Sequence, residues 1–173
     1  MPDSIHPDRK FLIRKATVDD ASAIIDVHHE AVHKTAAHDY EIDILDEWSS
    51  SLTDERLNQM KSQLTFNPDH TIMIVAELDG FIVGFGEIAP AKNELRAVYV
   101  LPAKGRMGIG KRLLHHLEDL ARSHGVDSLW LDASLNAEAF YAAHGYESTG
   151  RGIHELRSGR KMTCVKMGKR LTG

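Results

Sequence analysis

Cysteine is almost absent from this sequence, since Cys164 is the only one among 173 residues. One cysteine cannot form a disulfide within a chain, which excludes a small secreted domain held by disulfides and favours a reducing, cytoplasmic location. Long apolar runs are absent as well, because no stretch approaches the roughly 20 residues of a membrane span. Residues 1–11 contain no apolar segment typical of a signal peptide. We therefore expect a cytoplasmic protein that does not interact with membranes.

An excess of positive charge is also missing. Lysine and arginine number 21 against 25 aspartates and glutamates, which gives a net charge of -4. This balance argues against a general nucleic-acid binder, so the expected partner is small. The length is that of one ordinary domain. We predict a single domain over residues 1–173, in which residues 1–10 form a flexible N-terminal tail.

The first half of the chain predicts one strand followed by two helices. Residues 11–17 form the strand, and Thr17 begins a capping pattern for a helix that continues to about Ala36. A second helix follows Thr53, where apolar residues recur at three- and four-residue spacing. Between the two helices, residues 39–47 contain five acidic side chains in nine positions. We interpret this run either as a solvated loop or as an acidic lip that favours a cationic ligand.

In the second half of the chain the spacing of apolar residues changes from helical to strand-like, which predicts a sheet. Two β-rich runs at 71–78 and 81–88 flank Asp79-Gly80, which is a strong signal for a hairpin. The order βααβββαβαββ alternates helices and strands only late in the chain, so it indicates a mixed α/β (α+β) sheet flanked by helices. The remaining predicted elements are strand 94–100, helix 109–125, strand 128–134, helix 136–144 and closing strands at 146–149 and 162–167.

The stretch GRMGIGKR at 105–112 joins a predicted strand to a predicted helix. A helix N-terminus presents unpaired N–H groups and a partial positive charge, and glycines let a ligand approach the backbone, so the stretch predicts a phosphate site. As a P-loop it fails at Arg112, because a P-loop has Ser or Thr there to hold Mg²⁺. As a dinucleotide fingerprint it fails at Leu113, where the third glycine belongs. A pyrophosphate site for coenzyme A is the third interpretation.

The run LRAVYVLPAKGRMGIGKRLLHHLEDLA and the later AFYAAHGY at 139–146 resemble the GNAT superfamily of acetyl-CoA-dependent N-acetyltransferases. In that family a turn of the type V-x-P-x-x-[QR]-x-x-G-x-[GA] binds acetyl-CoA, and a later Ala-x-x-x-Tyr-x-x-x-Gly-aromatic segment supplies a tyrosine. Gly105 stands here at the Gln or Arg position, and Ser134 stands where the family often has Asn. The resemblance implies the GNAT fold, a central, mixed, mostly antiparallel, twisted sheet of six to seven strands flanked by about four helices.

The resemblance also implies how acetyl-CoA is held. The backbone N–H of Val98 would face the acetyl oxygen, and main-chain groups around Val98 and Val100 would pair with the pantetheine arm. The glycine turn would bind the pyrophosphate. The residues expected at the coenzyme are Val98, Tyr99, Val100, Gly105, Arg106, Met107, Gly108, Ile109, Gly110, Lys111, Ser134 and Ala137.

Two residues are expected to be catalytic by the same resemblance. Tyr141 matches the general acid that protonates the coenzyme A sulfur, and Glu94 matches the catalytic glutamate of histone-acetyltransferase members. The alternative for Tyr141 is a packing role on its short helix. Glu87 is the rival base, and deprotonation of the amine through ordered water needs no unique base. Cys164 has no obvious activating partner and is not expected to be a nucleophile.

Several histidines lie on or after the first predicted helix. His29 and His33 are one helical turn apart, but the glutamate of H-E-x-x-H and a further ligand are missing, so we predict no metal site. We interpret these histidines as a solvated or substrate-facing helix surface. Trp48 is either a wall of the acceptor site or an anchor that folds its loop onto the core.

These observations predict an N-acetyltransferase that moves an acetyl group from acetyl-CoA to a primary amine of a small molecule or peptide, by direct attack in a ternary complex. The alternative is a catalytically inactive acyl-CoA-binding sensor or interaction module of the same fold. The sequence identifies no particular amine. We expect a monomer or a homodimer.

Overall fold

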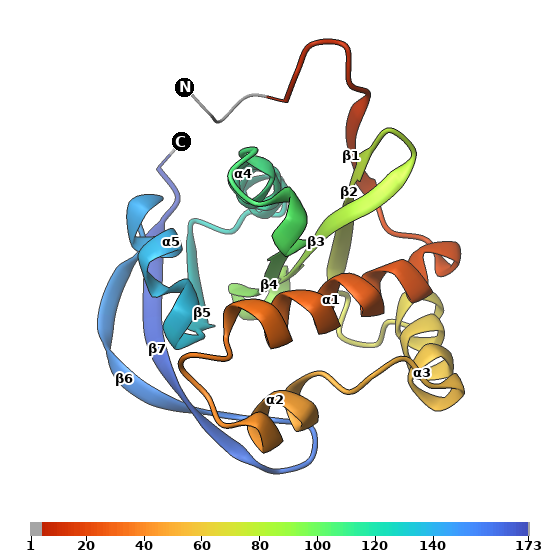
Figure 1. Ribbon diagram of the computed structural model, residues 1–173. Helices are drawn as coiled ribbons and strands as arrows, with labels where there is room; N and C mark the ends of the chain where they lie inside the picture. Colours follow the sequence, from red (N-terminus) through yellow and green to blue (C-terminus); the bar gives the residue numbers. More distant parts are fainter. Residues whose placement is uncertain (1–4, 173) are drawn as a thin grey trace.

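Seven strands in one sheet organise residues 5–172, the part of the chain that this computed structural model describes (Figure 1). The strand order is β1-β2-β3-β4-β5-β7-β6, and of these neighbouring pairs only β4–β5 is parallel. The predicted mixed, mostly antiparallel sheet is therefore confirmed. The strands are β1 (Phe11–Lys15), β2 (Ile72–Leu78), β3 (Phe81–Ala89), β4 (Glu94–Val100), β5 (Ser128–Ala133), β6 (Glu147–Glu155) and β7 (Lys161–Arg170).

Helices cover both faces of this sheet (Figure 1). In residues 5–172, no helix is both long and apolar enough to cross a membrane. The helices of this described part are α1 (Ala21–Thr35), α2 (Ile42–Trp48), α3 (Asp54–Thr65), α4 (Ile109–Ser123) and α5 (Glu138–Ala143).

Helix α2 corrects the prediction of a solvated loop at 39–47. Its residue Leu45 is buried and packs against Val32 of α1, with Ile44 and Trp48 packed beside it. Apolar residues at helical spacing thus form a buried stripe within an acidic run. The stripe is only about two turns long, so the acidic composition hides it in the sequence.

Alternation along the strands assigns each helix to a face. Phe85 of β3 packs with Ile24 and Val27 of α1, whereas a Cβ at the neighbouring Gly84 or Gly86 would meet α4 side chains. Successive residues of a strand point to opposite faces. Helix α4 therefore covers one face, and α1 covers the other.

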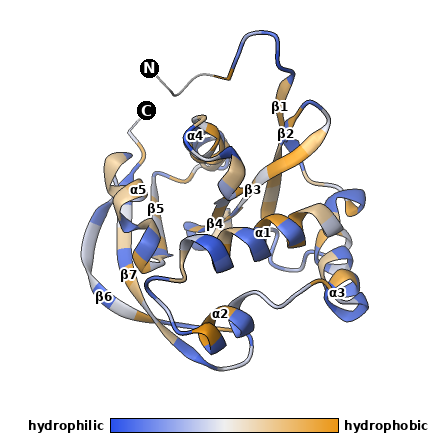
Figure 2. Ribbon diagram, viewed as in Figure 1, coloured by the Kyte–Doolittle hydropathy of each residue, from blue (hydrophilic) through white to orange (hydrophobic). Residues whose placement is uncertain are grey.

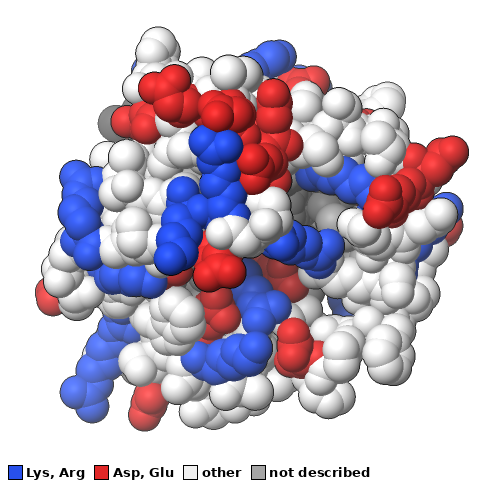
Figure 3. All heavy atoms as spheres, turned by 90° about the horizontal axis from the view of Figure 1, so that it is seen from below, with Lys and Arg blue, Asp and Glu red and all other residues white. Residues whose placement is uncertain are grey.

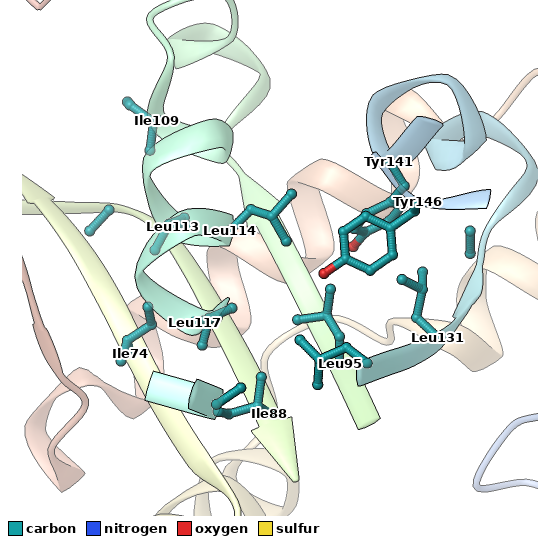
Figure 4. Packing of buried hydrophobic residues seen from close by; sticks show 14 of the residues in the cluster. Ile74, Ile88, Leu95, Ile109, Leu113, Leu114, Leu117, Leu131, Tyr141 and Tyr146 are labelled. Atoms are coloured by element: carbon teal, nitrogen blue, oxygen red, sulfur yellow. The ribbon is translucent and has the colours of Figure 1, made fainter. Parts of the chain in front are cut away.

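Close packing of α4 on the sheet depends on glycine. A Cβ placed on Gly86 would lie 2.6 Å from Cδ1 of Leu117, a distance that real side chains do not adopt. With no side chain in the way, the apolar residues of α4 reach Ile74 and Ile88 of the sheet, as Figure 4 shows. Figure 2 shows that α1, like α4, alternates hydrophobic and hydrophilic residues along its length. This packing fixes α4, and with it the N-terminal end of that helix, against β3 and β4.

The N-terminal segment differs from the predicted flexible tail over residues 5–10, while residues 1–4 lie outside the described part. Ile5 is 9% exposed and belongs to the main core. The Arg9 guanidinium is 2.7 Å from the Asp79 carboxylate, and that carboxylate also accepts from the Lys10 N–H at 2.9 Å. Residues 5–10 are thus tied to the β2–β3 turn.

Candidate active site

Strands β4 and β5 separate next to a bulge in β4. The bulge lies at Arg96, because the residues on either side of it pair with adjacent residues of β3. Between β4 and β5 only one pair of residues is in register, Glu94 with Trp130. Beyond this pair the strands border a small cavity of about 160 Å³, with Val98 on one side and Ser134 on the other. The parallel pair is therefore open where the sequence predicts acyl-group binding.

A second, larger cleft extends from this opening along the start of α4. It has a volume of about 620 Å³ and lies between β4, the glycine turn and α5. Its described lining contains no acidic side chain, which makes it suited to a polyanion. Four cationic side chains line it: Lys104, Arg106, Lys111 and Arg112.

Backbone conformation aims N–H groups at this cleft. Gly108 precedes α4 with φ +74°, and Arg106 has φ +62°. The first helical bond runs from the Arg112 N–H to the Gly108 carbonyl at 3.1 Å, so the N–H groups before Arg112 have no partner within the helix. A Cβ on Gly110 would lie 3.3 Å from the Phe140 ring. The turn therefore combines an anion-binding helix start with a narrow approach that favours glycine.

Tyr141 of α5 lies where this cationic cleft meets the small cavity between β4 and β5. Its side chain is 6% exposed, and in the described part its hydroxyl has no hydrogen-bond partner within the protein. Figure 4 shows it beside Tyr146, whose hydroxyl instead donates to Glu118 at 3.1 Å. Burial raises the pKa of Tyr141, so the hydroxyl keeps its proton at neutral pH. Of the two tyrosines, Tyr141 is the one with a proton free to donate.

The opposite face of β4 borders a third cavity, of about 640 Å³, between α1, α2, α3 and the β6–β7 turn. One wall is aromatic and is centred on Tyr99. The Tyr99 ring stacks on the Phe85 ring with 5.4 Å between the ring centroids, and it meets the His28 ring edge-on with 4.6 Å between the centroids. The Trp48 ring also contacts Tyr99 edge-on. Figure 3 views the molecule from the α2 side and shows a hollow bordered by acidic and basic side chains. We call this space the acceptor cavity.

The two candidate bases lie in different surroundings. Glu87 lines the acceptor cavity, is 7% exposed and lies 3.4 Å from the Gln63 side-chain amide. Burial raises the pKa of Glu87, which shifts this carboxylate toward the range of a general base. Glu94 instead lies 3.2 Å from the Arg96 guanidinium and lines none of the three cavities above. The geometry thus favours Glu87.

Three histidines of α1 gather on the segment between α2 and α3. His28 Nδ1 lies 2.7 Å from the Ser49 hydroxyl. His29 and His33 both direct a ring nitrogen at the Ser49 carbonyl, at 2.9 and 2.8 Å, and each must donate to it. These side chains therefore hold the wall of the acceptor cavity, and His29 and His33 are not part of a solvated surface.

Two of the five acidic side chains in run 39–47 pair with one arginine. Asp43 and Glu47 both pair with Arg160, at 2.8 and 3.1 Å, and Glu47 also accepts from Ser158. This arginine offsets only one of the five negative charges, so the run keeps most of its acidic character. Trp48 combines its two predicted roles, because it packs beneath α1 and also lines the acceptor cavity.

Most residues predicted at the coenzyme meet in one place. Tyr99, Met107 and Ser134 do not line the cleft. Strand alternation turns the Tyr99 ring into the acceptor cavity, Met107 packs against the core, and Ser134 faces the small cavity. Those that line the cleft are Val98, Val100, Gly105, Arg106, Gly108, Ile109, Gly110, Lys111 and Ala137.

Other lining residues escaped sequence reasoning. Asn136 is two positions after Ser134 and, unlike it, lines the cleft. His115 is one turn along α4 from Lys111, so helical spacing was the available signal. Cys164 is remote in sequence yet lines the same small cavity as Tyr141, and burial raises the pKa of its thiol, which argues against a nucleophile. The remaining new lining residues are Lys104, Phe140 and His144, and Arg112 of the predicted turn lines the cleft as well.

Fold and site together define an α/β protein in which a helix start suited to an anion lies beside an opened pair of strands. Residues 30–146 match the model of the Acetyltransferase (GNAT) family, which is more than half of the chain. The chain therefore belongs to the GNAT acetyltransferase family, whose members use acetyl-CoA.

Individual relatives share the fold at modest identity. An aminoglycoside N(6')-acetyltransferase type 1 of Serratia marcescens is 26% identical over 120 residues, which is 61% of this chain and 82% of the relative. The structure of a GCN5-related N-acetyltransferase of Rhodopseudomonas palustris matches with a TM-score of 0.81 and 26% identity, covering 92% of this chain and 94% of that one. A putative acetyltransferase of Salmonella typhimurium with its cofactor acetyl-CoA matches with a TM-score of 0.67 and 24% identity, over 94% of both chains.

Proposed function

We propose that this protein is an N-acetyltransferase that transfers the acetyl group of acetyl-CoA to a primary amine, with both substrates bound at once. The observation that carries the proposal is the position of the Tyr141 hydroxyl. This unpartnered hydroxyl lies where the cationic cleft meets the opening between β4 and β5. The acceptor cavity lies on the other side of β4. Two ligands can therefore approach the same strand from opposite faces.

The cleft suits the coenzyme. Its cationic lining and the free N–H groups at the start of α4 fit a pyrophosphate. Acetyl-CoA supplies an activated acetyl group as a thioester. Val98 and Val100 would bind the arm that carries it, since β4 has no β5 partner beyond Glu94. Ser134 and Ala137 would border the acyl end.

The proposed chemistry needs two proton movements. Glu87, directly or through water, accepts a proton from the amine as its nitrogen attacks the acetyl carbon. Tyr141 donates its proton to the coenzyme sulfur as the carbon–sulfur bond breaks. The raised pKa of Tyr141 disfavours a lasting phenolate, so the hydroxyl regains a proton from water before the next turnover. Glu94, which opens β4 four residues before Val98, is kept as the alternative base.

Calorimetric titration of acetyl-CoA followed by turnover tests this function. We expect binding at micromolar strength or tighter, release of free coenzyme A with at least one primary amine, and an acetylated amine by mass spectrometry. ATP with Mg²⁺ serves as the control ligand and is expected not to bind. Tight acetyl-CoA binding without coenzyme A release over a broad amine panel would instead identify an acyl-CoA-binding module.

A further inference from the structure

Two arginines border the acceptor cavity without a carboxylate partner. Arg56 of α3 donates through Nη2 to His28 Nδ1 and to the Ser49 hydroxyl, both at 3.1 Å, while its Nη1 is buried and has no hydrogen-bond partner. Arg157, from the turn between β6 and β7, lines the same cavity. In residues 5–172 neither arginine has an acidic side chain within ion-pair distance.

The other arginines of the described part provide a comparison. Six other described arginines pair with acidic groups: Arg9, Arg14, Arg96, Arg122, Arg151 and Arg160. Three more described arginines have no such partner: Arg106 and Arg112 line the cleft assigned to the coenzyme phosphates, whereas Arg170 is exposed at the end of β7. Unpaired arginines at a cavity of this protein thus coincide with a site suited to an anion.

The two unpaired cations also repel each other. Burial lowers the pKa of Arg56; the charge of Asp26 of α1 opposes this shift without forming an ion pair, and the charge of Arg157 adds a smaller lowering effect. A buried donor without a partner is costly, and like charges brought together are destabilising. An anionic group between Arg56 and Arg157 would remove the repulsion between the two cations.

The rest of the cavity defines the other parts of the ligand. Glu87 supplies a buried carboxylate that suits an amine, and Phe85, Trp48 and Tyr99 supply an aromatic wall. The cavity has further acidic groups, but Glu47 is paired with Arg160. The remaining lining acids, Glu55 and Glu155, are exposed and form no ion pair with Arg56 or Arg157.

We propose that the acceptor carries a carboxylate beside its primary amine, as an amino acid does, and that Arg56 and Arg157 bind this carboxylate while Glu87 faces the amine. This inference rests on the proposed function, because it names the substrate class of the same cavity. Arg56 and Arg157 are then specificity-determining residues, and the aromatic wall contacts the side chain of the acceptor.

Binding of matched acid and amide pairs tests the inference without requiring turnover. The protein is saturated with coenzyme A, and the twenty standard L-amino acids and their carboxamides are titrated by calorimetry. We expect at least one acid to bind about tenfold or more tightly than its amide, because the amide lacks the charge that the guanidinium groups bind. Arg157→Gln is expected to abolish this preference. Arg157 is exposed, so its replacement does not threaten folding.

Two further variants complete the design. Arg56→Lys keeps the charge but loses the planar donor pair, and should weaken acid binding while leaving amide binding unchanged. Arg170→Gln removes an exposed arginine at the end of β7 that also has no acidic partner in the described part, and should change nothing. Equal binding of acid and amide in every pair, no binding of any acid, or a preference that survives Arg157→Gln would each overturn the inference.

Turnover separates this inference from the proposed function. Acids that bind with the expected preference but release no coenzyme A support the carboxylate site and contradict acetyl transfer. Amides and simple amines acetylated as efficiently as the acids support transfer and overturn the carboxylate site. Both KM and kcat are compared between each acid and its amide. An amide group also lowers the basicity of the neighbouring amine, and this can change the rate even without a carboxylate site.

Discussion

Nη2 of Arg56 lies 3.1 Å from Nδ1 of His28, and because a guanidinium only donates, the ring nitrogen must accept. The Ser49 hydroxyl, 2.7 Å from the same nitrogen, donates as well. His28 is therefore a neutral imidazole with its proton on Nε2. Burial, followed by the nearby charge of Arg56, lowers the pKa of His28 to about 3. The wall of the acceptor cavity is thus built around an uncharged histidine.

Stability should therefore fall on mild acidification. The unfolded chain binds a proton at His28 near pH 6.5, whereas the folded protein does so only near pH 3. The contribution of the neutral His28 to the free energy of unfolding is therefore complete above pH 6.5 and is lost as the pH falls toward 3. At pH 5 the loss from this residue is at most about 2 kcal/mol. Urea unfolding at pH 7 and pH 5 measures it. His28→Asn, which keeps a side-chain acceptor but cannot titrate, should lose less, and an equal loss in both proteins would contradict the assignment.

The position of Gly108 offers a test of the phosphate site in which only charge differs. Gly108 has φ +74°, a region that Asn and Asp tolerate better than other residues with side chains. Gly108→Asp places a carboxylate at the start of α4, and Gly108→Asn places a neutral group of the same shape there. We expect the Asp variant to bind acetyl-CoA about tenfold or more weakly than the Asn variant. Calorimetry on the two variants checks this, and equal affinities would place the pyrophosphate elsewhere.

Local signals in the sequence predicted much of the fold. The Asp79-Gly80 hairpin and the apolar stripe of α4 are each contained in one short segment, so periodicity and turn chemistry were sufficient. The glycine turn and Tyr141 were found for a related reason, because each belongs to a compact motif. Only the family resemblance indicated that the glycine turn and Tyr141 belong to one site, because periodicity does not relate distant segments.

Contacts between distant segments were not predictable in the same way. Arg160 neutralises Asp43 across 117 positions of sequence, so the acidic run of α2 read alone suggested a cationic ligand. Arg157 enters the acceptor cavity from the turn between the last two strands. Glu94 opens β4 and Glu87 lies within β3 opposite Ala97, so both lie near Val98, and only the bulge at Arg96 and the burial of Glu87 distinguish them. Register and burial follow from packing of the whole chain.

Replacement of Tyr141 tests the general acid. Tyr141→Phe removes a hydroxyl that has no partner within the described protein, so stability and acetyl-CoA affinity should stay nearly unchanged. The loss of a general acid should lower kcat by about a hundredfold. Steady-state release of coenzyme A measures kcat, and calorimetry measures affinity. Tyr146→Phe is the matched control, since it breaks the 3.1 Å bond to Glu118 and should cost about 1 kcal/mol of stability with little change in kcat.

The pH dependence of the two glutamate variants tests the base. A general base works only when deprotonated, so kcat/KM should fall as the pH drops below the pKa of Glu87, which burial raises above the ordinary value for a glutamate. Glu87→Gln should lower kcat/KM by about a hundredfold and remove this acidic limb from the profile.

Glu94→Gln is the matched control for that substitution. It breaks the 3.2 Å pair with Arg96 outside the three cavities, so it should keep the acidic limb and most of the rate. Glu87→Gln should also be at least as stable as the parent protein, because it buries an amide in place of a carboxylate that burial disfavours. A Glu87→Gln enzyme with the rate and profile of the parent protein would mean that water alone removes the amine proton, and loss of the limb in Glu94→Gln instead would assign the base to Glu94.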